Sequence, residues 1–303
     1  MNFEQYFSIS ADPYYFAALA VDFILLFAML VLVRKLFGRS VGGVDTTAEL
    51  AENDNHAFGI SLGGATVALA IVFAGVASGD VATSLAIEAA FILGYGVLGI
   101  AMLMCTRWIF DKIVFPGIDL KQMILQGNIA AGILDGGNMV ATAAVIYGVF
   151  SWISGDWLTG VGLVIGMFVV TQMLLVLVSR YRTIVFAKRN QGRVFAKAIE
   201  DGNAALALRF AGFQIGAALA ISSAGKLVNF QEDGQIMLSI AAWVVSALVL
   251  LAAIILLTAL TEKVVLYGVP VAREVDAQSN YGVAAVEAGA YIGLGLIIVT
   301  LLG

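Results

Sequence analysis

A four-fold internal repeat is the feature of this sequence that most constrains its fold. Each copy opens at an asparagine, and successive openings follow at intervals of 73, 75 and 77 residues. The asparagines are Asn55, Asn128, Asn203 and Asn280, and each is followed nine residues later by a glycine, at Gly64, Gly137, Gly212 and Gly289. A near-constant spacing with shared positions indicates four copies of one structural unit.

Small residues mark the same helix face in all four copies. They stand two residues after the asparagine (Ala57, Ala130, Ala205, Gly282), nine residues after it, and thirteen residues after it (Ala68, Ala141, Gly216, Gly293). Steps of seven and four residues place these positions on one face of a helix. A smooth face lets another helix backbone approach closely, which is how helices associate in lipid. We therefore expect the four repeated glycines at close helix contacts, and Gly295 at a lipid-facing position.

The asparagines are expected at helix starts. Acidic residues precede three of the four. Asparagine is a favoured N-cap, and negative charge complements the positive end of the helix dipole. The four asparagines are thus predicted to be structural N-caps rather than ligand-binding groups.

The composition places the chain in a membrane. Hydrophobic residues make up 61% of the chain and charged residues 12%, whereas about a quarter of a soluble domain is charged. Eight apolar segments are long enough to cross a bilayer as helices, which takes roughly 20 residues. They are Tyr14–Val33, Ala57–Ala77, Leu85–Cys105, Ile129–Phe150, Leu158–Val178, Ala204–Gly225, Ile236–Leu260 and Gly282–Leu302. Strands of a membrane barrel would be about half that length and would alternate in polarity, so we predict an all-α polytopic membrane protein with eight transmembrane helices.

Basic residues predict the orientation of these helices. Of the 16 Lys and Arg residues, 14 fall in the connections after the first, third, fifth and seventh segments: Arg34, Lys35, Arg39, Arg107, Lys112, Lys121, Arg180, Arg182, Lys188, Arg189, Arg193, Lys197, Lys263 and Arg273. By the positive-inside bias these connections are cytoplasmic and both termini are periplasmic. Each repeat is then a helical hairpin, and the four hairpins are parallel.

The hairpins also pair off into two units. The second and fourth copies share a proline in the cytoplasmic loop (Pro116, Pro270) and an acid seven residues after the asparagine (Asp135, Glu287). The first and third copies have neither feature. This predicts two four-span units, at residues 1–153 and 154–303, that arose when a duplicated hairpin was duplicated again.

Four short motifs resemble those of a known family. They are Asp54-Asn55-His56-Ala57-Phe58-Gly59 with Gly63-Gly64, Gly127-Asn128 with Gly136-Gly137, Gly202-Asn203 with Gly212, and Ser279-Asn280 with Gly289. An acidic loop, an asparagine and a glycine step that opens an apolar helix are similar to the bacterial inner-membrane proteins of the domain-of-unknown-function-350 family, the YjfL-like group. The resemblance covers all four hairpins and implies two fused units in the bacterial inner (plasma) membrane. It implies no established activity, only an association with envelope-stress and channel-like genes.

Ionisable residues inside the predicted spans are candidates for function. A charge near the bilayer centre costs about 2.5–3.5 kcal/mol on insertion scales, so such groups face the protein interior or water. Glu88 lies near the outer end of its span and can reach the headgroups. The other four ionisable residues in the spans are Asp22, Asp135, Arg209 and Glu287. Together with Asn138, which shares a helix face with Asp135, they form the candidate permeation route or buried polar network.

The distance of Arg209 from the cytoplasmic end of its helix predicts its ion-pair partner. It stands six residues after its asparagine, and Asp135 and Glu287 each stand seven residues after theirs. At 1.5 Å rise per residue, all three lie about 9–10 Å from the cytoplasmic helix ends. We expect an ion pair of Arg209 with Glu287, and Asp135 as the alternative, because adjacent hairpins are the nearer neighbours.

Several kinds of chemistry are excluded. The single cysteine, Cys105, excludes an intramolecular disulfide and a thiolate metal cluster, and the single histidine, His56, excludes a bis-histidine haem and a multi-histidine zinc site within one chain. No predicted span carries a central lysine, which argues against a retinal Schiff base. The sequence contains no HExxH, G-x-S-x-G or phosphate-binding Gly-Lys-Ser/Thr motif. We expect no enzymatic activity, no cofactor and no metal site.

Two functions stay open. A channel or secondary transporter for protons or small cations is favoured by the repeats and the buried acids, both common in transporters. The alternative is a membrane scaffold that docks a cytoplasmic envelope-stress protein, with the acids serving helix packing only; parallel repeats and uninterrupted spans weigh on this side. The basic stretch from Arg180 to Lys197 fits an anionic partner as well as a topology signal. We expect a lipid bilayer as the surroundings, a homo-oligomer or a cytoplasmic peripheral protein as candidate partners, and no nucleic acid.

Overall fold

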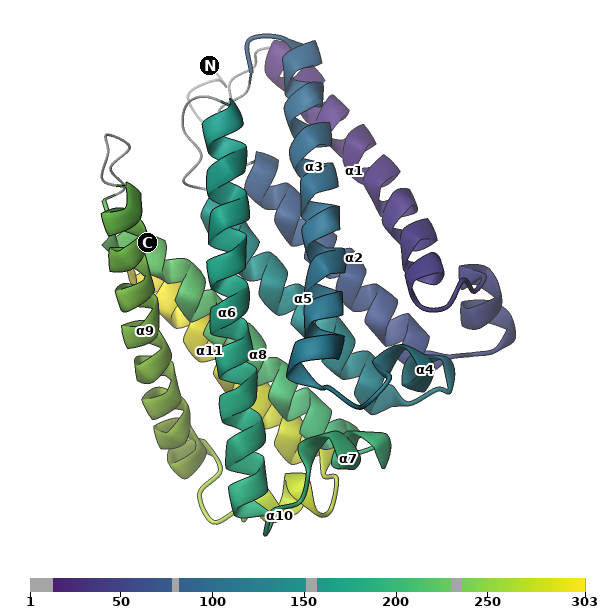
Figure 1. Cartoon of the computed structure of the whole chain (residues 1–303), viewed down its shortest axis with the longest axis vertical. Helices are drawn as coiled ribbons and strands as arrows, with labels where there is room; N and C mark the ends of the chain where they lie inside the picture. The colour runs from purple at the N-terminus through teal and green to yellow at the C-terminus, as the bar shows by residue number, and fades with distance from the viewer. Residues whose placement is uncertain (1–12, 78–81, 151–156, 230–235, 303) are drawn as a thin grey trace, which may run out of the picture.

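The fold is a bundle of long helices. The computed structural model describes residues 13–77, 82–150, 157–229 and 236–302, and within these ranges all regular secondary structure is helical. Eight of the described helices are long and apolar enough to cross a membrane, which confirms the predicted fold class (Figure 1). They are α1 (Pro13–Ser40), α2 (His56–Ala77), α3 (Leu85–Ile109), α5 (Ile129–Phe150), α6 (Trp157–Arg189), α8 (Ala204–Ser223), α9 (Ile236–Val265) and α11 (Tyr281–Leu302).

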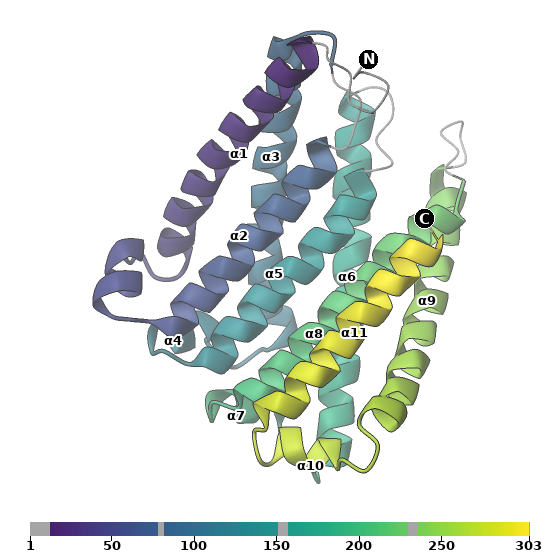
Figure 2. The ribbon, with the colours of Figure 1, turned by 180° about the vertical axis from the view of Figure 1, so that it is seen from behind.

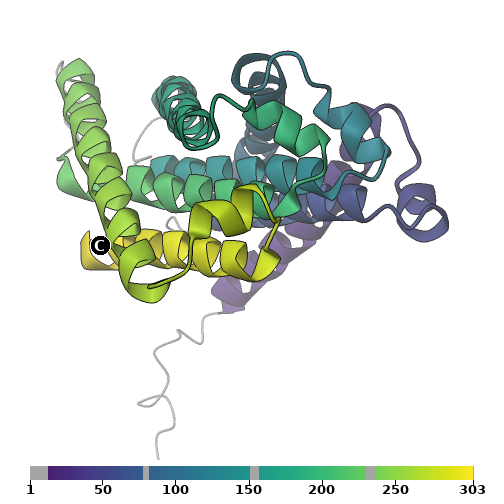
Figure 3. The same ribbon diagram turned by 90° about the horizontal axis from the view of Figure 1, so that it is seen from below.

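Four of these helices form a central row. They are α2, α5, α8 and α11, the helices that begin at the repeated asparagines, and they lie side by side in chain order (Figure 2). The view from below shows α5, α8 and α11 running next to one another, with the short connecting helices at the near end (Figure 3). Each remaining long helix after α1 packs on two members of the row: α3 on α2 and α5, α6 on α5 and α8, and α9 on α8 and α11. The middle of the row is the most buried part of the molecule.

A short helix and a tight turn precede every row helix. The short helices are η2 (Ala48–Glu52), α4 (Leu120–Leu125), α7 (Phe195–Glu200) and α10 (Val271–Asp276). The residue directly before each repeated asparagine has a positive φ angle: 45° at Asp54, 81° at Gly127, 84° at Gly202 and 55° at Ser279. A left-handed residue at this place ends the short helix and redirects the chain, so that the asparagine can begin the next helix.

All four asparagines make the same N-cap hydrogen bond. The side-chain oxygen accepts from the backbone N–H three residues later, at 3.0 Å for Asn55, 3.1 Å for Asn128, 2.9 Å for Asn203 and 3.2 Å for Asn280. This is the geometry that the sequence predicts for an N-cap.

The asparagine side-chain nitrogens link one repeat to the next. Each of the first three donates to a carbonyl at the end of the following repeat's short helix: Asn55 to Ile124 at 3.0 Å, Asn128 to Ile199 at 2.9 Å, and Asn203 to Val275 at 3.1 Å. Asn280 has no following repeat in the chain, and it donates to Glu274 Oε2 of its own repeat at 2.8 Å. These bonds fix the starts of neighbouring row helices side by side, so the row is parallel and in register.

Three of the repeated glycines lie at backbone contacts between row helices. A Cβ atom would collide with the facing residue in each case: on Gly64 with Gly136, on Gly137 with Ala211, and on Gly212 with Ala288. The facing residue always stands eight positions after its own asparagine. Contact between position nine of one repeat and position eight of the next therefore recurs at all three interfaces of the row.

Gly289 and Gly295 do not follow the expectation. A Cβ on Gly289 would meet no atom of the described part of the chain within 4 Å, so the predicted close contact is wrong there. A Cβ on Gly295 would lie 2.8 Å from the carbonyl oxygen of Gly216, so this glycine is packed and does not face lipid. The physical reason is that α11 is the last helix of the row, and only one of its two faces has a neighbour.

Several helices extend beyond the apolar segments. The spans that we expected to end at Val178 and Leu260 continue as helix to Arg189 and Val265, and the one expected to end at Cys105 continues through Ile109 into a π-helical turn (Phe110–Val114). Arg107, Arg180 and Arg182 therefore lie in helices and not in loops. These helical extensions position the arginine side chains that take part in the charge clusters.

The left-handed turn generates a test of stability. Ser279→Gly should raise the free energy of unfolding by up to about 1 kcal/mol, because a residue with a Cβ pays a steric cost of roughly 1–2 kcal/mol in this conformation and glycine does not. Gly202→Ser, the reverse change at the equivalent position, should lower it by a similar amount. Thermal unfolding in detergent measures both, and a lower melting temperature for Ser279→Gly would show that the turn is not strained.

Candidate functional site

Arg209 on α8 is the centre of a buried charge cluster in the second half of the chain. Its guanidinium group contacts three carboxylates: Nε lies 3.0 Å from Glu287 Oε2, Nη1 lies 3.2 Å from Asp276 Oδ1, and Nη2 lies 3.7 Å from Glu262 Oε1. The side chains of Arg209, Asp276 and Glu287 are buried, and that of Glu262 is 21% exposed, at the edge. The ion pair of Arg209 with Glu287, which equal depth predicts, is present.

Tyr291 and Arg182 complete this second-half cluster. The Tyr291 hydroxyl oxygen lies 2.5 Å from Glu262 Oε1 and 2.9 Å from Glu287 Oε1. The Arg182 guanidinium carbon lies 4.5 Å from the ring centre of Phe213 and 5.6 Å from that of Tyr291. The second-half cluster thus contains two guanidinium groups and three carboxyl groups, so it has one negative charge in excess when every group is ionised.

The first half contains a smaller cluster around Arg107 of α3. Its Nη2 lies 2.8 Å from Asp135 Oδ2 on α5, and both side chains are buried. Ser61 donates its hydroxyl to the same carboxylate oxygen, and Arg107 Nη1 donates to Ser40 Oγ at 2.8 Å. Asp135, the predicted alternative partner of Arg209, is therefore paired with Arg107 instead. The buried carboxyl group of Asp111, in the π-helical turn after α3, also interacts electrostatically with Arg107 and Asp135. In this first-half cluster one arginine therefore lies among two carboxyl groups.

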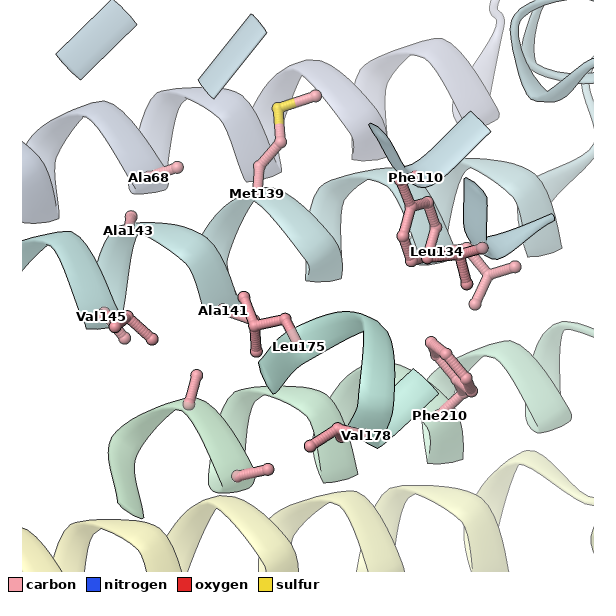
Figure 4. Packing of buried hydrophobic residues seen from close by; sticks show 14 of the residues in the cluster. Ala68, Phe110, Leu134, Met139, Ala141, Ala143, Val145, Leu175, Val178 and Phe210 are labelled. Carbon is pink, nitrogen blue, oxygen red and sulfur yellow. The ribbon is translucent and has the colours of Figure 1, made fainter. Parts of the chain in front are cut away.

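The register of the row places both clusters at equivalent positions. Position six of one repeat faces position seven of the next, and this rule brings together Ser61 with Asp135, Leu134 with Phe210, and Arg209 with Glu287. Leu134 and Phe210 are both buried and lie on facing sides of α5 and α8 (Figure 4). The contact is polar within each half of the chain and apolar at the junction between the halves.

One amide pair crosses that junction. Gln214 on α8 donates from Nε2 to Asn138 Oδ1 on α5 at 2.9 Å, and both side chains are buried. Gln172 and Thr106 line the same small space. Among the described residues, Asn138 Nδ2 and Gln214 Oε1 have no further hydrogen-bond partner.

Asp22 lies outside both clusters. It is on α1, where its Oδ1 is buried without a hydrogen-bond partner among the described residues, and it interacts electrostatically with Glu88 of α3. Glu88 accepts a hydrogen bond from the backbone N–H of Ala82 at 2.7 Å. The five residues predicted as one network therefore fall into four separate groups. In the part of the chain that the structure describes, no three His, Cys, Asp or Glu side chains are arranged to hold a metal ion.

Comparison with known families accounts for the two-part organisation. The model of Domain of Unknown Function (DUF350) matches the chain twice, over residues 12–150 and 156–302. The chain belongs to the DUF350 family. The two matches are tandem copies, as expected of two fused units, and each DUF350 copy contains one buried charge cluster. Comparison of this DUF350 chain with curated proteins and with solved structures gives no significant match.

A repeat signal for the arginines of the DUF350 chain was missed. Arg34, Arg107 and Arg182 each stand 21 residues before a repeated asparagine. The structure uses two of these arginines in the buried clusters, whereas the Nη2 of Arg34 donates to Thr47 Oγ1 at 2.8 Å near the surface. Glu262 and Asp276 gave no repeat signal, because their copies have no acid at the equivalent positions.

The first-half cluster predicts a difference between single and double substitutions. Arg107→Leu should lower the free energy of unfolding by about 3–5 kcal/mol, because it leaves the Asp135 carboxylate buried without its counter-charge. Arg107→Leu combined with Asp135→Leu should recover part of this loss. The measurement is thermal unfolding in detergent; a double variant no more stable than the single would show that the pair is not a coupled unit.

The second-half cluster predicts an asymmetry between its base and its acids. Arg209→Leu leaves three carboxyl groups facing Arg182 alone, whereas Glu287→Gln leaves Arg209 with two carboxylates and removes the excess negative charge. Arg209→Leu should therefore reduce the folded yield strongly, and Glu287→Gln should reduce it little or not at all. Size-exclusion profiles measure the folded yield of both variants. Equal losses of folded protein in the two would contradict the excess of one negative charge in the second-half cluster.

Proposed function

We propose that this multi-pass membrane protein is a channel or secondary transporter for protons or small cations, in a bacterial inner membrane with both termini periplasmic, and not an enzyme. The observation that carries the proposal is the excess carboxyl group in the second-half cluster. Two guanidinium groups face three carboxyl groups there, and the side chains of Arg209, Asp276 and Glu287 are almost fully buried.

An uncompensated charge in such a place is costly. The effective penalty of burying an ion is several kcal/mol even after the protein relaxes, so an excess carboxylate is stabilised by taking up a proton or a cation. The contacts of Tyr291 support a proton. Its hydroxyl has one hydrogen to donate but lies within 2.9 Å of two carboxyl groups. Both contacts are hydrogen bonds when one of those carboxyl groups is itself protonated.

The second-half cluster has a route to one surface. An open pocket of about 710 Å³ between the end of α9 and the short helix α10 is lined by Glu262, the partly exposed acid of the cluster. Arg189 and Lys263 line the same pocket. By the positive-inside bias this is the cytoplasmic side. A proton or cation that enters the pocket reaches Glu262 first, and Tyr291 connects Glu262 to Glu287.

Reconstitution tests the proposal. The purified chain is placed in liposomes that contain a pH-sensitive dye, and a potassium gradient with valinomycin supplies the driving potential. We expect proton flux above that of protein-free liposomes and at least a tenfold slower flux with Glu287→Gln, which removes the exchangeable carboxyl group while keeping its size. Glu200→Gln is the matched control, since Glu200 lies at the surface in an ion pair with Lys197 and contributes to neither cluster.

The scaffold alternative gives the opposite result. If the acids serve helix packing only, no proton, sodium or potassium gradient drives flux through the wild-type chain. The cytoplasmic loops then become the functional part, and a peripheral protein of the cytoplasm becomes the partner to identify.

A further inference from the structure

The row of repeated helices has two open ends. We call the side of a row helix that packs on the next repeat its late face, and the side that packs on the preceding repeat its early face. At each of the three internal interfaces, the late face of one row helix contacts the early face of the next in one fixed register. Within the described residues, the late face of α11 and the early face of α2 have no such neighbour. A Cβ atom on Gly289 of α11 or on Gly63 of α2 would meet none of these residues within 4 Å.

The two open faces match each other in the register of the internal interfaces. If α2 of a second copy followed α11, position nine would place Gly289 against Gly63 at position eight. Position six would place Val286, which is 43% exposed in the single chain, against Leu62 at position seven. This is an apolar pair like Leu134 with Phe210, the pair at the same positions where the first DUF350 copy meets the second. A contact between the second DUF350 copy of one chain and the first DUF350 copy of another chain thus repeats the contact that joins the two DUF350 copies within one chain.

Two further features end at the same boundary. Asn280 is the only repeated asparagine whose side-chain nitrogen does not reach a following repeat. The equivalent acceptors on a second chain are the carbonyls at the end of the short helix Ala48–Glu52. In addition, α3, α6 and α9 each pack on the row helix of the preceding repeat as well as on their own, but α1 has no preceding repeat. On α1, Phe23 and Phe27 are 59% and 65% exposed.

We propose that α11 of one chain packs against α2 of a second copy, head to tail, so that the central row continues from chain to chain. The occupant is a second copy because the internal interfaces define the required partner: a row helix with glycine at position eight, an apolar residue at position seven and a short helix before its asparagine. The α2 helix has all three. A head-to-tail contact uses two different surfaces, so it produces a ring when its rotation closes and an open chain when it does not.

The neighbouring helices leave this contact free. In the internal repeats, α3 lies beside α5 and α6 lies beside α8, and both faces of α5 and α8 are nevertheless used by the row. α1 stands in the same relation to α2. It therefore leaves the early face of α2 open, and in the assembly it gains the α11 helix of the preceding chain as a second row helix to pack on, beside its contacts with α2 and α3.

Crosslinking in membranes tests the orientation. In a Cys105→Ser background, which removes the single native cysteine, Leu62→Cys and Val286→Cys are introduced alone and together. The two positions lie at opposite ends of one chain's row, separated by α5 and α8, so they cannot join within a chain. Under oxidation the double variant should give a ladder of covalent multimers, and a mixture of the two single variants coexpressed with different tags should give a dimer that carries both tags. No covalent product would overturn the proposal, and so would a dimer from Val286→Cys alone, which requires a two-fold contact.

Glycine substitutions test the assembly without unfolding the chain. Gly289→Leu and Gly63→Leu should keep the helical circular dichroism spectrum and the folded yield, because the space beside each glycine is open within one chain. They should nevertheless convert the assembly to single chains, measured by native mass spectrometry from nanodiscs. Gly166→Leu on α6 is the matched control, since its surroundings are equally open but it lies away from the row ends; it should leave the assembly intact. A single-chain mass for the wild type, or an unchanged assembly in both row-end variants, would overturn the proposal.

Discussion

The close approach of parallel helix backbones at the glycine contacts is the constraint on which the rest of this structure depends. Lipid offers little gain from burying apolar surface against apolar surface, so helices hold together where their backbones can meet. Gly64, Gly137 and Gly212 permit this at three successive interfaces, and the facing residue is always glycine or alanine. The asparagine amide bonds at the helix starts fix the register in which these contacts occur.

Once that register is fixed, the positions of the charges follow from it. Position six faces position seven at every interface, so the identity of two residues decides whether an interface is polar or apolar at that depth. The two halves use this freedom differently. The first half pairs Asp135 with Ser61 and recruits Arg107 from α3, whereas the second half places Arg209 directly opposite Glu287 and surrounds it with further acids. The same contact geometry thus holds one arginine among two carboxyl groups in the first copy, and two arginines among three carboxyl groups in the second.

The sequence predicted those parts of the structure that depend on local pattern. The repeats, the eight spans, the asparagine N-caps and the pairing of Arg209 with Glu287 all follow from spacing, hydropathy and helical rise. What depends on tertiary contacts was not predictable in this way. Arg107, Arg182 and Glu262 were assigned to loops because the apolar segments end before them, yet the helices continue and carry their side chains back into the protein. Gly289 was expected at a helix contact but is open, and Gly295 was expected to face lipid but is packed. Repeat position alone does not show that α11 has only one neighbour in the row.

The asparagine links also impose a direction on how the chain is built. Asn55 donates to the carbonyl of Ile124, which is 69 residues further along the chain, and the next two asparagines reach forward by 71 and 72 residues. A ribosome that adds roughly 5–20 residues per second delivers each such acceptor about 3–14 seconds after its donor. The hydrogen bond from each of the first three asparagines to the next repeat can therefore form only after the short helix of that repeat has been translated. The row is therefore linked from the amino end in three successive steps, and Asn280 donates to Glu274 of its own repeat.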